Sequence, residues 1–268
     1  MKKISVILLT AALALTMLAG CGSAAGKASS DSSRTTLTVG FNAEFPPYGY
    51  MDDKGDYVGF DLDLAAEVCK RKGWELKKQP IDWDAKDMEL SSGSIDCIWN
   101  GFTIQGREDD YTWSVPYVDN SQVFVVKTDS GISGLADLAG KNVGVQKDSS
   151  ALAALEEDKK DLADTFGNLT QYADYNTGFM DLEAGAIDAL AIDIGVANYQ
   201  IAQKGDGFKM LDEQLASEQY GVGFLKGNTE LKDEVEAVLL EMAADGTVLK
   251  IAKNYSDFGM EEALCIGK

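Results

Sequence analysis

Short apolar runs alternate with amphipathic segments along the chain from Leu37 onward. Runs with the length and residue types of strands lie at residues 38–41, 76–81, 95–99, 142–145, 169–172 and 187–192. Apolar residues with helical spacing lie at residues 61–72, 84–90, 150–157, 176–184, 194–203 and 229–244. Gly73 follows the first of these helices as a stop signal. Alternating strands and helices predict an α/β fold with covered sheets.

The strand–helix unit occurs twice, which predicts two α/β lobes. The β-rich stretches at 121–127 and 219–225 can run between them. We predict lobe 1 over 37–120 and 222–268, lobe 2 over 124–217, and a hinge at 121–123 and 218–221. The helix at 229–244 then returns to lobe 1. Ligands bind beyond the carboxyl ends of strands in open α/β sheets, and those ends fall at Asn42, Trp83, Asn100, Gln146 and Asp193.

The N-terminus has a pattern of its own. Lys2 and Lys3 precede an apolar run that is too short to span a membrane comfortably. We predict a signal peptide over 1–20. The sequence LAGC at 18–21 resembles the bacterial lipobox, which predicts that Cys21 is a lipid-modified N-terminus on the outer face of the cell membrane; the alternative is an ordinary signal peptide with an incidental cysteine. Residues 21–36 have the composition of a flexible tether, and no second apolar run reaches membrane length.

The composition of the chain disfavours several classes of function. The formal charge is −20 at pH 7, which disfavours binding to nucleic acids. The chain has no histidine, so the commonest general base and metal ligand is absent, and we expect no metal, no cofactor and no catalytic site. Cys69, Cys97 and Cys265 are expected as free thiols, although an exported chain permits a disulfide.

Two segments carry candidate anion-binding chemistry. Residues 100–107 read NGFTIQGR, so Arg107 follows a strand end closely. A guanidinium matches a carboxylate, but an exposed arginine in a turn fits the same letters. Residues 146–150 read QKDSS at a strand-to-helix junction, where amides and hydroxyls suit an anion. Alternatively, Ser149 or Ser150 caps its own helix.

Asp193 and three aromatic residues complete the candidate site. Asp193 follows a buried run and could bind an ammonium group or cap the next helix. Phe45, Tyr48 and Trp83 could enclose a side chain or belong to the core.

The order of these elements resembles the bacterial amino-acid-binding proteins of ABC importers, extracellular solute-binding protein family 3. The matching stretches are FPPY at 45–48, GFDLDLA at 59–65, NGFTI at 100–104, PY at 116–117, IDA at 187–189 and YGV at 220–222. The resemblance runs from about Leu37 to Tyr255. It implies a two-lobed, type II periplasmic-binding-protein-like fold in which each lobe is a mixed sheet flanked by helices, joined by two hinge strands.

The resemblance also implies roles for single residues. Arg107, Thr103 and the Ser150 amide would bind the ligand carboxylate, and Asp193 with the Gly101 carbonyl would bind the ammonium group. Phe45 and Trp83 would enclose the side chain. Further ligand-binding positions are Asn42, Asn100, Phe102, Gln146 and Ser149. We expect a monomer that binds a free polar amino acid, cationic ones included, and delivers it to an ABC transporter permease.

Two departures from the family pattern concern this site. Only three residues separate Thr103 from Arg107, one fewer than usual, and Gly106 would let the shorter turn aim Arg107 inward. Lys147 and Asp148 stand where the family often has a glycine before the serine. An exported enzyme resembling prephenate dehydratases, using Glu44 or Asp193, and an amino-acid sensor are the alternative functions. Which amino acid is bound stays open.

Overall fold

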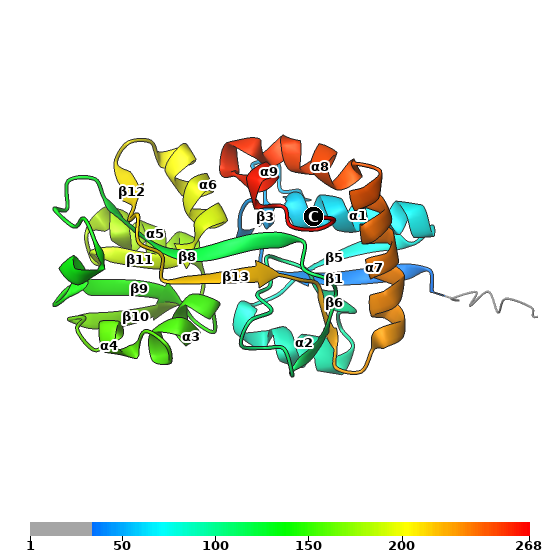
Figure 1. Ribbon diagram of the computed structural model, residues 1–268, viewed down its shortest axis with the longest axis horizontal. Coiled ribbons are helices and arrows are strands. Elements are labelled where there is room, and N and C mark those ends of the chain that lie inside the picture. The colour runs from blue at the N-terminus through cyan, green and yellow to red at the C-terminus, as the bar shows by residue number, and fades with distance from the viewer. Residues whose placement is uncertain (1–33) are drawn as a thin grey trace, which may run out of the picture. The chain divides into compact units, whose positions relative to one another are not determined.

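The computed structural model describes residues 34–268, and two mixed sheets form its framework (Figure 1). The order of the first sheet is β5 (Glu75–Pro80), β1 (Thr36–Phe41), β6 (Cys97–Ile98), β14 (Gly223–Leu225) and β7 (Tyr111–Trp113). Strand β1 pairs in parallel with β5 and β6, whereas β14 pairs antiparallel with β6 and β7. The expected α/β fold with mixed sheets is therefore confirmed.

The second sheet has the order β10 (Asn168–Tyr172), β9 (Asn142–Gln146), β11 (Ala189–Asp193), β8 (Val118–Lys127) and β12 (Phe208–Met210), with β13 (Ala216–Tyr220) also paired to β8. Apolar side chains cover both faces of this sheet, as the central strand β11 shows. Its alternate residues face opposite ways and enter two different apolar clusters. Leu190 and Ile192 join the cluster that contains Phe179 and Val196 of the covering helices. Ala189 and Ala191 join a second cluster on the other face.

Helices cover both sheets. Helix α1 (Phe60–Lys72) buries Leu62, Ala65 and Val68 and ends at Gly73, whose left-handed backbone lets its amide bond to carbonyls of the last turn, as the sequence predicted. The remaining helices are η1 (Trp83–Ala85), α2 (Lys86–Ser92), η2 (Leu135–Leu138), α3 (Ser150–Glu156), α4 (Lys160–Ala163), α5 (Tyr175–Ala184), α6 (Ile194–Lys204), α7 (Thr229–Ala244), α8 (Thr247–Ala252), η3 (Lys253–Phe258) and α9 (Met260–Ala263).

The chain passes between the two sheets twice, through β8 and β13, which lie antiparallel side by side (Figure 1). The β-rich stretch at 219–225 contains the end of β13 and all of β14, which belong to different sheets, with Gly221 and Val222 between them. Gly221 donates to the carbonyl of Phe102, and a Cβ on it would meet the Ile104 side chain at 2.9 Å. The chain therefore passes close to Ile104 where it leaves one sheet for the other.

Three other elements differ from the sequence prediction. The strand at 95–99 is limited to β6: the Asp96 amide still donates to the Thr38 carbonyl, but the Thr38 amide donates to the Asp96 side chain, which also binds Arg34. The helix expected at 84–90 is a 3-10 turn, η1, followed by α2. The loop at 42–57 contains a small sheet of β2 (Glu44–Phe45), β3 (Gly49–Met51) and β4 (Tyr57–Val58).

The C-terminal helices return to the first sheet, as expected. Helix α7 is tied to α1 by ion pairs of Lys72 with Glu234 and of Arg71 with Asp245, both at 2.8 Å. Cys69, Cys97 and Cys265 are free thiols, and burial raises the pKa of Cys69 to about 11. The predicted signal peptide, Cys21 and most of the tether lie outside the described residues.

Candidate functional site

A cavity of about 20 Å³ lies where strand ends of both sheets meet. It is lined by nine residues, all of them predicted from the sequence: Phe45, Trp83, Gly101, Thr103, Arg107, Gln146, Ser149, Ser150 and Asp193. Its volume is on the scale of a single water molecule and far below the several hundred Å³ of a typical ligand site. An amino acid therefore enters only if the surrounding segments move apart.

Arg107 reaches the cavity from the loop after β6. Gly106 has φ +78°, and the Arg107 amide closes the turn on the Ile104 carbonyl at 3.0 Å. The guanidinium lies 5.4 Å from the centre of the Phe102 ring, and its Nη2 donates to the Asp148 carbonyl at 3.3 Å. The shorter turn therefore does direct Arg107 toward the cavity. With five N–H groups, the side chain retains donors for a carboxylate.

Thr103 and Ser150 come from different sheets and meet beside Arg107. The Thr103 hydroxyl donates to Ser150 Oγ at 3.3 Å. Ser149 uses its side chain locally: Oγ accepts from the Leu152 amide at 3.1 Å and donates to the Gln146 carbonyl at 2.8 Å. The helix-cap interpretation therefore holds for Ser149, whereas the Ser150 hydroxyl faces across to the other sheet.

Asp193 is buried beneath the opposite end of the cavity. It occupies the N-cap position of α6, but its side chain makes no cap hydrogen bond. Instead, Oδ1 accepts from Asn120 at 2.9 Å, from Gln122 at 2.6 Å and from the Tyr220 hydroxyl, and Oδ2 accepts from Tyr175 at 3.1 Å. The alternative that Asp193 serves as a helix cap is therefore wrong.

A second buried carboxylate, Glu218, lies beside Asp193. Asn120 and Gln122 donate to Glu218 at 2.6 and 2.8 Å, so the same two amides bridge both acids. Burial and the charge of Glu218 raise the pKa of Asp193 above its ordinary value. The donors around the two acids are amides and hydroxyl groups, so the pair can balance its charge by binding a proton or an external cation.

These hinge-strand residues were not found from the sequence. Asn120 and Gln122 are two residues apart on β8, and Glu218 lies directly opposite Asn120 on β13. Two amides at a spacing of two in a β-rich run place both on one strand face, which was an available signal. The hydrogen bonds to Glu218 depend on the pairing of β8 with β13 and on its register. These two strands are about a hundred residues apart in the sequence.

Phe45, Gly101 and Trp83 shape the walls. The Phe45 ring contacts the rings of Tyr48 and Tyr175 at 5.5 and 5.9 Å. Gly101 has φ +55°, and a Cβ there would meet the Phe45 ring at 2.7 Å, so only glycine fits. Trp83 is half-buried and donates from Nε1 to the Asp148 carbonyl at 3.2 Å.

A buried carboxylate behind the wall holds Gly101 in place. Asp61 Oδ2 accepts from the Gly101 amide at 2.6 Å and from the Tyr117 hydroxyl at 2.8 Å. Burial raises the pKa of Asp61 to about 7. Asp61 lies in the GFDLDLA stretch of the sequence, but no role was predicted for it.

Asn42, Asn100 and Phe102 are not among the cavity-lining residues. The Asn42 amide donates to Asn100 Oδ1 at 3.0 Å, and Asn42 Oδ1 accepts from the Glu44 amide at 2.8 Å, so these side chains fix the strand ends. The Phe102 ring packs at 5.0 Å from Tyr111 and is fully buried. Contact of these three residues with a ligand stays a prediction.

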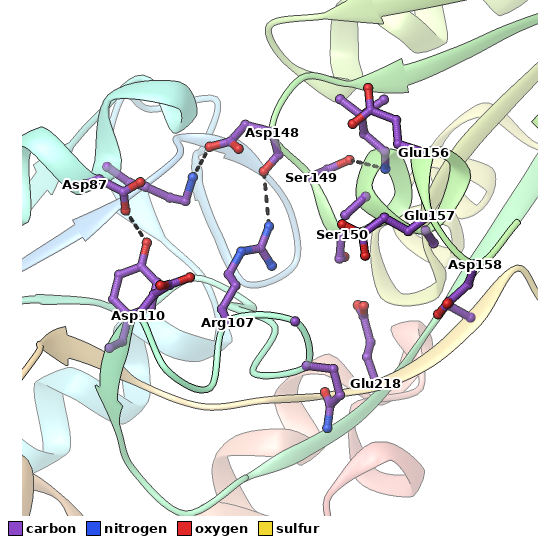
Figure 2. A pocket seen from close by; sticks show the side chains of 18 of the residues that line it. Asp87, Arg107, Asp110, Asp148, Ser149, Ser150, Glu156, Glu157, Asp158 and Glu218 are labelled. Atoms are coloured by element: carbon purple, nitrogen blue, oxygen red, sulfur yellow. Dashed lines mark hydrogen bonds and ion pairs between the residues drawn. The ribbon is translucent and has the colours of Figure 1, made fainter. Parts of the chain in front are cut away.

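A larger groove of about 690 Å³ adjoins the cavity (Figure 2). Arg107, Ser149 and Ser150 line both spaces. The groove carries an excess of carboxylates, namely Asp87, Asp110, Asp148, Glu156, Glu157, Asp158 and Glu218. Among residues 34–268, no group of three Asp, Glu or Cys side chains is arranged to hold a metal ion. No helix in the same part of the chain is long and apolar enough to cross a membrane.

Residues 37–259 match the family of bacterial extracellular solute-binding proteins, family 3, and the chain belongs to this family. Among its relatives, the arginine-binding extracellular protein ArtP of Bacillus subtilis is 31% identical, with 93% of this chain and 96% of ArtP covered. The L-cystine-binding protein TcyJ of Escherichia coli strain K12 is 30% identical, with 83% of each chain covered.

Solved structures agree with the fold. A substrate-binding protein of an ABC uptake transporter from Streptococcus pneumoniae, with bound histidine, superposes with a TM-score of 0.81 at 35% identity. The match covers 85% of this chain and 94% of the other. An ancestral arginine-binding protein bound to arginine gives a TM-score of 0.76 at 37% identity, covering 83% and 98%. The two-lobed, periplasmic-binding-protein-like fold is thereby confirmed, and the family consists of solute-binding proteins.

Proposed function

We propose that the protein captures a free amino acid between its two lobes and delivers it to an ABC importer. The observation that carries this proposal is the placement of Arg107 and Asp193, which come from different sheets, on one small cavity. Arg107, Thr103 and the Ser150 amide bind the α-carboxylate. Asp193 and the Gly101 carbonyl bind the α-ammonium group. One zwitterion thus connects the two lobes.

Closure follows from this division of contacts. Lobe 1 comprises 37–120 and 222–268, lobe 2 comprises 124–217, and the segments 121–123 and 218–221 act as the hinge. A ligand that touches both lobes favours the closed arrangement by its differential affinity for it. The cavity volume of about 20 Å³ supports a cycle in which the lobes separate to admit the ligand.

The ligand is a polar amino acid, with cationic ones included. Relatives named for arginine, cystine and histidine binding support this range. The pair of Asp193 and Glu218 adds negative charge beneath the cavity, which favours a ligand with a net positive charge. Phe45 and Trp83 enclose its side chain, and Asn42, Asn100, Phe102 and Gln146 tune selectivity, whereas Ser149 caps α3 beside them.

The protein works as an anchored monomer outside the cytoplasm. The signal peptide over 1–20 directs export, and lipid-modified Cys21 holds the chain at the outer face of the membrane through the tether at 21–36. The transporter permease is its partner. Retention of the wild-type protein in the membrane fraction, with release of Cys21→Ser into the medium or periplasm, tests the anchor.

A thermal-shift screen of the twenty amino acids and cystine tests the function. A ligand at 100 times its Kd stabilises the folded state by about 2.7 kcal/mol, which raises Tm by several degrees in a domain of this size. Calorimetry then measures the affinity of each amino acid that raises Tm. If none raises Tm and none gives binding heat, the proposal is wrong.

A further inference from the structure

Asp148 connects residues that lie far apart in the sequence. It follows β9 of the second sheet, yet three side chains from the first-sheet side bind it, and Figure 2 shows one of these contacts, the one with Arg107. Lys86 forms an ion pair with its carboxylate. Trp83 Nε1 and Arg107 Nη2 donate to its carbonyl at 3.2 and 3.3 Å. Asp148 thus holds two cavity residues and one cation at once.

The backbone at Asp148 is unusual. Its φ of +57° is the only positive value at a non-glycine residue among residues 34–268. Such a conformation is unfavourable for most side chains, although aspartate tolerates it better than most. The loop thus carries a carboxylate at a position where glycine would be less strained.

The Lys86 ammonium group depends on Asp148. The Lys86 side chain is only 2% exposed, and its other close contact is the Trp83 ring at 5.3 Å. A buried ammonium group requires a paired carboxylate, because its loss of hydration is otherwise uncompensated. Lys86 begins α2 beside the first sheet and Asp148 follows β9 of the second sheet, and both line the larger groove, so the pair exists only when these two segments are together.

We propose that Asp148, with Lys86, is a clasp that stabilises the closed arrangement and positions Trp83 and Arg107 for the ligand. No contact of the clasp involves a ligand atom, so it favours closure both with and without ligand. Asp148 is therefore a positioning residue that lowers the rate of ligand release. The effect on release rests on the proposed amino-acid binding, whereas the effect on closure does not.

Single substitutions can remove the ion pair of Asp148 with Lys86 without removing the backbone carbonyl that binds Trp83 and Arg107. Asp148→Asn and Lys86→Met remove the ion pair and leave the Asp148 carbonyl in place. Lys147→Met is the matched control, because Lys147 and Asp84 form a neighbouring ion pair at 2.5 Å between the same two segments, with both side chains about half exposed. Exposed pairs contribute little.

Closure is measured by pulsed electron paramagnetic resonance on the exported chain carrying Cys21→Ser and Cys265→Ser. Spin labels are attached at Met88→Cys on α2 and Met180→Cys on α5, both highly exposed. Without ligand, we expect a short-distance population in the otherwise unaltered chain. Asp148→Asn and Lys86→Met should reduce it at least twofold, and Lys147→Met should leave it unchanged.

Release is measured by stopped-flow fluorescence with L-arginine. We expect the dissociation rate constant to rise about tenfold in Asp148→Asn and in Lys86→Met, and less than twofold in Lys147→Met. The double variant should release no faster than either single variant, because the two residues act as a pair. Circular dichroism verifies that each variant is folded.

The two measurements distinguish the two proposals. If the parent chain binds no amino acid, the proposed function fails, and the distance measurement still decides the clasp. The clasp is wrong if the parent shows no short-distance population. It is also wrong if folded Asp148→Asn and Lys86→Met keep that population, or release bound L-arginine at the parent rate.

Discussion

Asp193 and Arg107 face the same cavity from opposite ends, but their surroundings differ. Asp193 is 4% exposed and accepts hydrogen bonds from four side chains, most of them on or next to the hinge strands. Arg107 is half-buried, and the acceptors it has are backbone carbonyls at 3.3 and 3.5 Å. In the proposed assignment, the ammonium end of the site is therefore held by a buried network. The carboxylate end is completed when Ser150 and Asp148 approach Arg107.

The largest effect is expected at the assembled end. Asp193→Asn removes the negative charge but retains the shape, so a bound ammonium group loses its buried partner. Loss of one member of a buried charge pair costs about 4 kcal/mol, which corresponds to a roughly 1,000-fold weaker Kd. Calorimetry with the amino acid found in the screen measures it. An affinity within tenfold of wild type would remove Asp193 from the site.

A smaller effect is expected at the exposed end. Arg107→Ala removes a charge-assisted hydrogen-bond partner from a half-exposed position, at a cost of about 3 kcal/mol, or a roughly 100-fold weaker Kd. Lys226→Ala is the control, since Lys226 lines the groove but not the cavity. If Arg107→Ala weakens binding more than Asp193→Asn does, the buried network is not the stronger end of the site.

The two ends also differ in their response to pH. The pKa of Asp193 is raised by burial and by the charge of Glu218, whereas a guanidinium remains charged throughout the accessible range. Because the bound ammonium group requires an ionised Asp193, binding must release a proton as the pH falls below that raised pKa. We expect affinity to fall by at least tenfold from pH 8 to pH 5, because pH 5 lies well below the raised pKa of Asp193. Calorimetry in buffers of different ionisation enthalpy should detect proton release that is lost in Asp193→Asn, and an equal release in that variant would contradict this assignment.

The sequence predicted the exposed end of the site better than the buried end. Arg107, Thr103 and Gly101 lie within one short segment after a strand, so the rule on strand ends made Arg107 and Gly101 candidates and the family resemblance added Thr103. The network around Asp193 depends on strand register, which brings Glu218 opposite Asn120. Lys86 and Asp148 are likewise 62 residues apart in the sequence and meet only in the folded chain. The pattern of apolar and polar residues specifies secondary-structure elements and their ends. It does not specify which distant polar groups are joined by hydrogen bonds.

The prediction of the fold succeeded and failed along the same line, because only local patterns could be recognised. Apolar periodicity indicated the strands that are buried on both faces, such as β9 and β11, with bounds close to the observed ones. It did not indicate the break between β13 and β14, where the Ile104 side chain leaves no room for a Cβ on Gly221. The small sheet at 44–58 was not predicted, because its short strands have no apolar repeat.

The smallest expected effect concerns Ser149, whose hydroxyl caps α3 beside the carboxylate end of the cavity. Ser149→Ala should lower the free energy of unfolding by about 1 kcal/mol, the usual cost of a lost N-cap, and should change the Kd less than threefold because the hydroxyl is already engaged locally. Asp174→Ala is the matched control, since Asp174 caps α5 in the same way, away from the cavity lining. Urea unfolding and calorimetry on both variants measure the two quantities. Equal losses of stability with unchanged affinity would establish Ser149 as a cap alone, whereas a tenfold loss of affinity in Ser149→Ala alone would make it part of the carboxylate site.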